Sequence, residues 1–341
     1  MVLRKRVMLR VVSLLTFLLL VTGCQKPPLS ESERPLPIRL AYSSTIDCAL
    51  VHLAMAKGFF QEQGVEVQPT ILSYGKQALE AVMAGEADMA TVAETPVVFA
   101  ALQGERLSIV AGIFSSKMNH AVVANRKRGV SRIEELRGKR IGFTRGTTSE
   151  IFLSYFLVAN NIEASEIIPV HVNPDQMPHA ILTGEVDAVS AWSPHLKVLT
   201  RRLGDNGTAF HDPDIYTEIF VLAGRPAYVE QNQEAVRRVI RALLKAEEFA
   251  SQRPAEAQAL LAGPLKFAPE ILCECWNESL FQVSIDHALL IALEEETRWA
   301  IKHHLAGDAT MPNYLDYIDS RALMAVKPEA VNVKVITSEI R

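Results

Sequence analysis

The stretch ALEAVMAGEADMA at residues 78–90 decides the fold class, because a similar stretch, AILTGEVDAV, occurs at residues 180–189. In both, a helical pattern ends in a Gly-Glu-x-Asp turn, and the two turns begin at Gly85 and Gly184, 99 residues apart. Glycine ends helices in the left-handed conformation, and such a turn then leads into a buried strand. Helix ends favour glycine in any protein, but the matching flanks favour an internal repeat and therefore two similar halves.

Strand and helix patterns alternate around these two turns. Short apolar runs predict strands, and apolar residues at helical spacing predict the helices between them. The first half has predicted strands at residues 38–42, 65–71, 88–92 and 107–113, with helices at 47–57, 76–84 and 97–103. The second half has predicted strands at 140–143, 167–172 and 187–191, with helices at 148–160 and 178–182. This alternation predicts an α/β fold with two mixed, mostly parallel sheets flanked by helices.

The amino-terminal segment predicts export from the cytoplasm. Four basic residues within the first ten precede an apolar run at residues 11–21 that is too short for a transmembrane helix, and the run ends in Val21-Thr22-Gly23-Cys24. This pattern resembles the lipobox of bacterial lipoproteins, in which the cysteine thiol takes up the lipid. We expect residues 1–23 to be a signal peptide and Cys24 to anchor an extracytoplasmic protein to the membrane, on the periplasmic side. The alternative is an ordinary cleaved signal with a chance cysteine.

Composition narrows the class of protein further. Residues 24–37 are rich in proline and polar residues, which predicts a flexible tether. The 318 residues from Cys24 onward exceed what one core usually serves, and their 31 basic against 39 acidic residues argue against nucleic acid as a partner. Only Cys48, Cys273 and Cys275 then remain, so we expect free thiols. The sequence contains no catalytic motif, metal-ligand spacing or phosphate-binding loop, so we expect no enzyme activity, no metal and no cofactor.

Three further segments carry a resemblance to a known family: AKGFFQEQGVEV at residues 56–67, IEELRGKRIG at residues 133–142 and AWSPH at residues 191–195. Together with both Gly-Glu-x-Asp turns and the lipobox, they resemble the periplasmic solute-binding proteins of ABC importers, in the group that handles sulfonates, nitrate and thiamine-precursor pyrimidines. The resemblance covers most of residues 38–250 in the family's order.

The resemblance implies a bilobal type II periplasmic binding protein whose first lobe is interrupted by the second. Lobe one would comprise residues 37–125 and 220–341, including the carboxyl-terminal helices, and lobe two would comprise residues 126–219. Two crossing segments, at residues 122–126 and 217–223, would form the hinge for closure over a ligand. The implied partners are a small-molecule ligand and ABC permease subunits, and the implied protein is a monomer.

Ligands in open α/β sheets bind beyond the carboxyl ends of the strands, and this rule selects polar side chains in both halves. In the first half they follow three strands: Ser43, Ser44, Thr45 and Asp47, then Tyr74, then Glu94 and Thr95. In the second half they are Arg145, Thr147, Thr148, Ser149 and the aromatic Trp192. The loop at residues 144–149 joins a strand to a helix and offers hydroxyls, a guanidinium and backbone N–H groups to an anionic group.

Structural roles compete with ligand contact in the second half. Thr147 and Glu150 have the spacing of a capping box, so Glu150 alone is able to satisfy the start of the helix. Trp192 has the size of a core residue, yet an indole is also a good flat wall for an organic ligand. We expect both the loop and Trp192 to contact the ligand.

The acidic candidates in the first half bear on the charge of the ligand. Two carboxylates in a cleft would repel a bare inorganic anion, so Asp47 and Glu94 favour a ligand with a cationic or amino group. The alternative for Asp47 is a helix N-cap. The alternative for Glu94 is to face solvent or to pair with Arg145 or Lys117.

Three functions fit these observations. A lipid-anchored binding protein would close over a small polar organic molecule, such as a sulfonate, an aminosulfonate or a pyrimidine thiamine precursor, and deliver it to an ABC permease. A ligand sensor that docks on a membrane receptor would share the same site. Pyrimidine-precursor synthases of yeast resemble these binders, but they carry a cysteine-rich motif that this chain lacks.

Overall fold

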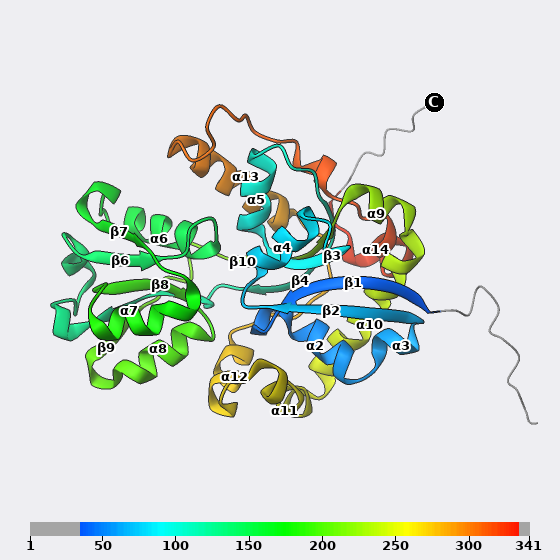
Figure 1. Cartoon of the computed structure of the whole chain (residues 1–341), viewed down its shortest axis with the longest axis horizontal. Coiled ribbons are helices and arrows are strands. Elements are labelled where there is room, and N and C mark those ends of the chain that lie inside the picture. Colours follow the sequence, from blue (N-terminus) through cyan, green and yellow to red (C-terminus); the bar gives the residue numbers. More distant parts are fainter. Residues whose placement is uncertain (1–34, 334–341) are drawn as a thin grey trace, which may run out of the picture. The chain divides into compact units, whose positions relative to one another are not determined.

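The computed structural model describes residues 35–333. The predicted signal peptide, Cys24 and all but the last three residues of the predicted tether lie outside the described residues. Within residues 35–333, no helix has both the length and the apolar character that crossing a membrane requires. The described chain contains two five-stranded sheets, each with helices on both faces (Figure 1).

The first sheet has the strand order β2-β1-β3-β10-β4. Its strands are β1 (Leu36–Ser43), β2 (Val65–Leu72), β3 (Met89–Ala93), β4 (Ser108–Ser116) and β10 (Glu218–Gly224). β1 runs parallel to β2 and β3, whereas β10 runs antiparallel to β3 and β4. One face packs against α2 (Ala49–Ala56) and α10 (Gln233–Gln252), and the other against α4 (Gly75–Met83), α5 (Glu94–Leu102) and α13 (His287–Lys302).

The second sheet repeats this topology with the order β7-β6-β8-β5-β9. Its strands are β5 (His120–Asn125), β6 (Arg140–Phe143), β7 (Ile168–His171), β8 (Ala188–Trp192) and β9 (Gly207–Phe210). β6 runs parallel to β7 and β8, and β5 runs antiparallel to β8 and β9. One face packs against α6 (Thr148–Ala159), the other against α7 (Met177–Thr183) and α8 (His195–Leu203). The two sheets therefore share one topology, as the internal repeat predicts.

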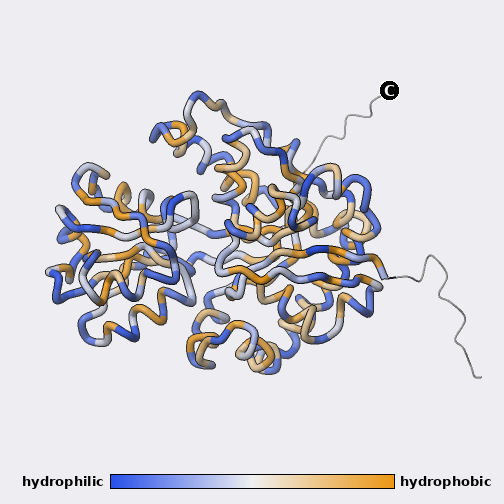
Figure 2. The backbone as a smooth tube through the Cα atoms, viewed as in Figure 1, coloured by the Kyte–Doolittle hydropathy of each residue, from blue (hydrophilic) through white to orange (hydrophobic). Residues whose placement is uncertain are grey.

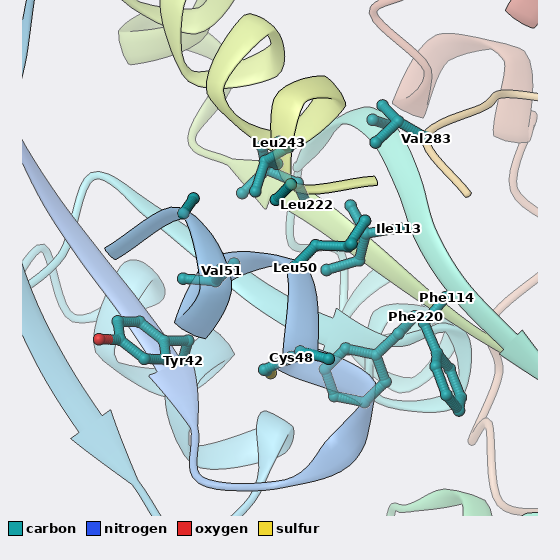
Figure 3. Packing of buried hydrophobic residues seen from close by; sticks show 14 of the residues in the cluster. Tyr42, Cys48, Leu50, Val51, Ile113, Phe114, Phe220, Leu222, Leu243 and Val283 are labelled. Atoms are coloured by element: carbon teal, nitrogen blue, oxygen red, sulfur yellow. The ribbon is translucent and has the colours of Figure 1, made fainter. Parts of the chain in front are cut away.

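The core of the first half is built from one apolar face of each covering helix. Val236, Ile240 and Leu243 of α10 recur at helical spacing, and all three are buried. They belong to the same cluster as Leu50 of α2 and Ile113 of β4 (Figure 3). Hydrophobic strands run through the interior of both sheets, while hydrophilic segments lie on the outside (Figure 2).

The remaining helices follow the second sheet or link neighbouring elements. They are α3 (Phe59–Glu62), α9 (Pro226–Gln231), α11 (Pro254–Leu265), α12 (Pro269–Asn277) and α14 (Arg321–Val326). Cys273 and Cys275 lie on α12, where the first is exposed and the second buried. Both are free thiols, as is the buried Cys48, which confirms the prediction for these three cysteines.

The first Gly-Glu-x-Asp turn fastens β1 to the start of β3. Asp88 Oδ2 accepts a hydrogen bond from the Arg39 backbone N–H at 2.9 Å, and the Arg39 guanidinium donates to Asp88 Oδ1 and to the Gly85 carbonyl. Gly85 has a φ of +77°, a conformation that a side chain with a Cβ disfavours. Asp88 thus accepts the hydrogen bond of the Arg39 backbone N–H group and also orients the Arg39 guanidinium, which binds the turn at Gly85.

The second Gly-Glu-x-Asp turn makes the same contacts between β6 and β8. Asp187 Oδ2 accepts from the Arg140 backbone N–H at 2.9 Å, and the Arg140 guanidinium donates to Asp187 Oδ1 and to the Gly184 carbonyl. The repeat seen in the sequence is therefore a repeat of one Asp–Arg clamp, used once in each half.

The two crossing segments differ from the predicted ones. β5 pairs with β8 and β9 in the second sheet, so the first crossing is residues 117–119 and not 122–126. β10 pairs with β3 and β4 in the first sheet, so the second crossing is residues 211–217 and not 217–223. The predicted boundaries after residues 125 and 219 shift accordingly. The apolar runs at 121–124 and 219–223 are strands that are buried on both faces. The apolar pattern of such a strand does not reveal which of the two sheets it joins.

Replacing Asp88 with alanine is expected to destabilise the fold. The Arg39 backbone N–H loses its acceptor at a partly buried position, so we expect a cost of about 1–3 kcal/mol, seen as a fall of several degrees in melting temperature. Thermal unfolding followed by circular dichroism measures the change. Asp308→Ala, at an exposed aspartate, is the control, and equal melting temperatures for the two variants would contradict the role of the clamp.

Candidate functional site

A small cavity lies where strand ends from both sheets meet, and we call it the inner cavity. Its volume is about 20 Å³, room for one water-sized group. Thr45 and Asp47 after β1, Tyr74 and Lys76 after β2, and Pro96 on α5 line it from the first half. Thr147, Thr148 and Trp192 line it from the second half, and β10 adds Glu218 and Phe220.

Two aromatic side chains form one wall of the inner cavity. The ring centroids of Tyr74 and Trp192 are 6.3 Å apart, with their planes tilted by 50°. Trp192 is 5% exposed and also meets His195 edge-on, at 6.1 Å between centroids. Trp192 is thus a packed residue that also faces the cavity, and its flat face suits an organic ring.

Four carboxyl groups are buried in this region, and we call them the acid cluster: Asp47, Glu94, Glu218 and Glu296. Each is at most 3% exposed. They belong to four separate elements, namely the 3₁₀ turn Ile46–Cys48, the first residue of α5, the first residue of β10, and α13. Asp47 and Glu218 line the inner cavity, and Asp47 Oδ1 has no hydrogen-bond partner among the described residues.

The acid cluster holds its protons more tightly than ordinary carboxyls do. Burial raises the pKa of Asp47 to about 7 and that of Glu94 to about 7. Burial, together with the neighbouring carboxylates, raises the pKa of Glu218 and of Glu296 well above the usual range. Ionising these groups together is unfavourable unless a positive charge is brought to them.

No lysine or arginine of the described residues forms an ion pair with the acid cluster, although Lys76 lines the same inner cavity. Across residues 35–333, no lysine or arginine nitrogen lies within 4.0 Å of a carboxylate in the acid cluster, and the nearest basic atom is His120 Nε2, at 4.0 Å from Glu218. Burial lowers the pKa of His120 to about 3, so this histidine is neutral at physiological pH. Nor do the described residues contain a group of three or more His, Cys, Asp or Glu side chains arranged to hold a metal ion.

Glu94 is held by the second crossing segment and the strand that follows it, which excludes the alternative to ligand contact that the sequence left open for this residue. Its carboxylate accepts hydrogen bonds from the Tyr216 hydroxyl and, at 2.9 Å, from the Ile219 backbone N–H. It neither faces solvent nor pairs with Arg145 or Lys117. Glu94 therefore ties α5 to the point where the chain enters the first sheet from the second crossing.

The first crossing segment is tied to the site as well. The Asn119 side-chain amide donates to Glu218, and His120 Nε2 lies 2.8 Å from Thr148 Oγ1. Thr148 is the first residue of α6 and lines the inner cavity. Both crossing segments thus contact residues that line the inner cavity or lie beside it.

The loop before α6 uses most of its polar groups internally. Thr147 Oγ1 donates to the Thr144 carbonyl at 2.7 Å and accepts from the Ser149 backbone N–H at 3.3 Å. Ser149 Oγ donates to the Ser190 carbonyl at 2.9 Å. Glu150 accepts from the Gly146 N–H, one residue before the position that the predicted capping box requires. Helix capping accounts for this loop, and the Thr147 side chain still borders the cavity.

The structure divides the predicted site residues into two groups. Thr45, Asp47, Tyr74, Thr147, Thr148 and Trp192 line the inner cavity. Ser43, Ser44, Glu94, Thr95, Arg145 and Ser149 do not. Ser43 Oγ, for example, lies 2.6 Å from Thr45 Oγ1 and 3.2 Å from Cys48 Sγ. The Ser43 hydroxyl is therefore hydrogen-bonded within its own turn. A ligand role stays a prediction for all twelve.

Two acidic residues were missed by sequence reasoning. Glu218 opens an otherwise apolar strand, and Glu296 lies on the buried stripe of α13 with Leu289, Leu293 and Ala300. A carboxyl among apolar residues at strand or helix period is the signal that would have found both. Lys76, Pro96 and Phe220 carry no such signal.

The family model for NMT1/THI5-like proteins matches residues 45–257, more than half of the chain. The chain belongs to this family. One relative, the formylaminopyrimidine-binding protein of Halalkalibacterium halodurans, is 23% identical over 259 residues, which cover 74% of this chain and 78% of that protein.

Solved structures of related architecture agree with the fold. The alkanesulfonate-binding protein SsuA from Xanthomonas axonopodis pv. citri, bound to MOPS, has a TM-score of 0.74 and 18% identity, covering 84% of this chain and 99% of that one. The periplasmic aliphatic sulphonate binding protein of Escherichia coli has a TM-score of 0.70 and 18% identity, covering 81% of this chain and 95% of that one. These likenesses confirm the predicted bilobal periplasmic-binding-protein fold.

Glu94 is expected to lower the stability of the protein as the pH rises from about 4 to about 7. Because burial raises its pKa to about 7, the folded state keeps a proton that the unfolded chain releases above an ordinary pKa of about 4.3. In Glu94→Gln this dependence is lost. The melting temperature of the variant, relative to wild type, should therefore rise between about pH 5 and about pH 8.

The comparison is made as a difference because other titrating groups face the same carboxyl, namely Tyr216, Glu218 and Glu296. Differential scanning calorimetry across the pH series gives the melting temperatures. Glu329→Gln, at an exposed glutamate, is the matched control. If the difference in melting temperature between Glu94→Gln and wild type stays constant with pH, the pKa of Glu94 is not raised.

Proposed function

We propose that this NMT1/THI5-like protein is a lipid-anchored, extracytoplasmic substrate-binding protein of an ABC importer, which closes over a small polar organic ligand and makes or breaks no bond. The position of the inner cavity carries the proposal, because residues from both sheets line it. Asn119 of the first crossing segment binds Glu218, where the second segment ends. Rotation of the two lobes about these segments would open and close the cavity.

The ligand in this proposal carries an amino group. An aminosulfonate or a pyrimidine thiamine precursor fits the acid cluster better than a plain sulfonate or nitrate, because carboxylates at low effective dielectric repel an anion. The wall formed by Tyr74 and Trp192 suits a flat ring. The name of the Halalkalibacterium halodurans relative, a formylaminopyrimidine-binding protein, supports the pyrimidine choice.

The remaining parts of the proposal concern delivery. The protein would act as a monomer that passes its ligand to ABC permease subunits at the membrane, with the lipid at Cys24 keeping it there. The names of the relative and of the two similar structures are those of binding proteins, which supports a role without catalysis.

A ligand panel tests the function directly. The chain from residue 25 onward would be titrated with taurine, alkyl- and arylsulfonates, nitrate and aminopyrimidines, with binding followed by calorimetry and thermal shift. A ligand at 100 times its Kd should add about 2.7 kcal/mol of stability. Binding of one of these compounds would support the binding function, and a preference for taurine or an aminopyrimidine over nitrate and plain sulfonates would support the amino group. No binding across the whole panel would count against the proposal.

Trp192→Ala is expected to weaken binding of whichever panel compound binds, by about 1 kcal/mol or more, or roughly fivefold or more in Kd. The substitution removes one half of the aromatic wall. Trp276→Ala is the control for lost packing, because Trp276 lies on α12 against Phe281, at 4.5 Å between ring centroids, and does not line the inner cavity. Unchanged affinity in Trp192→Ala would place this indole in the core alone.

Cys24→Ser is expected to release the protein from the membrane. The serine hydroxyl cannot take the place of the thiol that accepts the lipid, so the variant should move from the membrane fraction to the soluble extracytoplasmic fraction. Detergent-phase partitioning of wild type and variant measures this. Cys273→Ser, at an exposed cysteine, should leave partitioning unchanged. Equal partitioning of Cys24→Ser and wild type would exclude the lipid anchor.

A further inference from the structure

A second, larger cavity adjoins the inner cavity, and we call it the outer cavity. It lies between α4, α5 and the loop before α6, and its volume is about 310 Å³. That volume is within the range of ordinary small-molecule sites, whereas the inner cavity, at about 20 Å³, holds one functional group. The outer cavity therefore has the room that a ligand of several heavy atoms needs beyond the one functional group that the inner cavity holds.

Lys76 stands at the junction of the two cavities. Its side chain lines both, as does Pro96. Lys76 Nζ donates to the Arg145 carbonyl at 3.1 Å, so the lysine spans from α4 to the loop before α6. A Cβ at Gly146 would lie 2.8 Å from Lys76 Nζ, and Gly146 has a φ of +65°. The glycine thus leaves room for the lysine that separates the cavities.

The outer cavity has an apolar wall and a charge-balanced rim. Leu79 and Met83 of α4 and Phe99 and Ala100 of α5 form the wall. At the rim, Lys76 and Arg145 are balanced by Glu80 and Glu150. The apolar wall favours an apolar group of a ligand. The balanced rim charges favour neither anions nor cations.

The inner cavity differs in that two buried acidic side chains reach its mostly apolar lining. Asp47 and Glu218 line a space for one group, and Asp47 Oδ1 is an unpartnered oxygen on a side chain that is 3% exposed. An ammonium or other protonated amino group is about the size of a water molecule and donates hydrogen bonds to such oxygens. It also brings the positive charge that the acid cluster lacks.

We propose that the outer cavity is a second subsite, which holds the apolar body of a ligand whose protonated amino head lies between Asp47 and Glu218. This inference rests on the proposed binding function and on its amino group, but it assigns a different ligand class from the aminosulfonates and pyrimidines named above, namely amphiphilic amines with an alkyl or arylalkyl body. Lys76, which lines both cavities, would lie beside the part of the ligand where the polar head joins the apolar body.

Calorimetric titration with matched probes tests the two subsites. The probes are benzylamine, 4-phenylbutylamine, uncharged 4-phenylbutanol and anionic 4-phenylbutyrate. Affinity should rise by roughly tenfold or more from benzylamine to 4-phenylbutylamine, since the longer chain buries more apolar surface. The alcohol and the carboxylate should each bind at least about tenfold more weakly than the amine of equal length.

Two variants separate the subsites. Met83→Trp narrows the outer cavity, so it should weaken 4-phenylbutylamine by roughly tenfold while leaving benzylamine within about twofold. Met324→Trp, at an exposed methionine on α14, is the matched control and should change neither. Asp47→Asn should weaken both amines together, because it removes charge from the shared head subsite.

The outcomes distinguish this inference from the proposed function. Equal affinity for short and long amines, or equal effects of Met83→Trp and Met324→Trp, would overturn the outer subsite. Binding of an alkylsulfonate without an amino group, or of 4-phenylbutyrate, without binding of the amines would overturn the amine head, while the binding function would stand. Failure of every probe, together with failure of the earlier panel, would overturn both.

Discussion

The Asp–Arg clamp is the contact on which the rest of the structure depends, because it sets the register of the strands whose ends form the site. Asp88 holds the Arg39 backbone N–H, and β1 then pairs with β3 from Leu40 opposite Met89. Asp187 does the same for Arg140, which brings Ile141 opposite Ala188. A slip of one residue would turn every side chain of a strand to the other face.

The register carries through to the inner cavity. With β1 and β3 in place, the turn that contains Thr45 and Asp47 lies beside the start of α5, where Glu94 and Pro96 are. With β6 and β8 in place, Thr147 and Trp192 arrive at the same edge of the second sheet. One short motif, used twice, therefore delivers both halves of the site, and this explains why the repeat is the strongest signal in the sequence.

Much of the fold and part of the site were predictable from the sequence, and the limits have physical causes. The alternation of strands and helices is local, so period and turn chemistry reveal it. The sheet that a crossing strand joins is not local: the runs at residues 121–124 and 219–223 are apolar throughout, and either sheet would bury them. The rule on strand ends found Asp47, Tyr74 and Trp192 because these positions follow from topology. It also selected Ser43 and Ser149, which do not line the inner cavity: the Ser43 hydroxyl bonds to Thr45 two residues on, and the Ser149 hydroxyl bonds to the Ser190 carbonyl, which only the folded chain brings close.

The acid cluster shows most clearly why a folded structure is needed to infer a ligand. Glu94 contacts Tyr216, 122 residues away, and Glu296 reaches the cluster from α13, beyond both sheets. Burying carboxyls without a basic partner costs folding free energy, which a well-packed apolar substitute would avoid. A cationic ligand supplies the missing charge from outside, so part of its binding free energy is the relief of that cost. Because the four carboxyls belong to the 3₁₀ turn after β1, α5, β10 and α13, one positive charge among them would also draw these elements together.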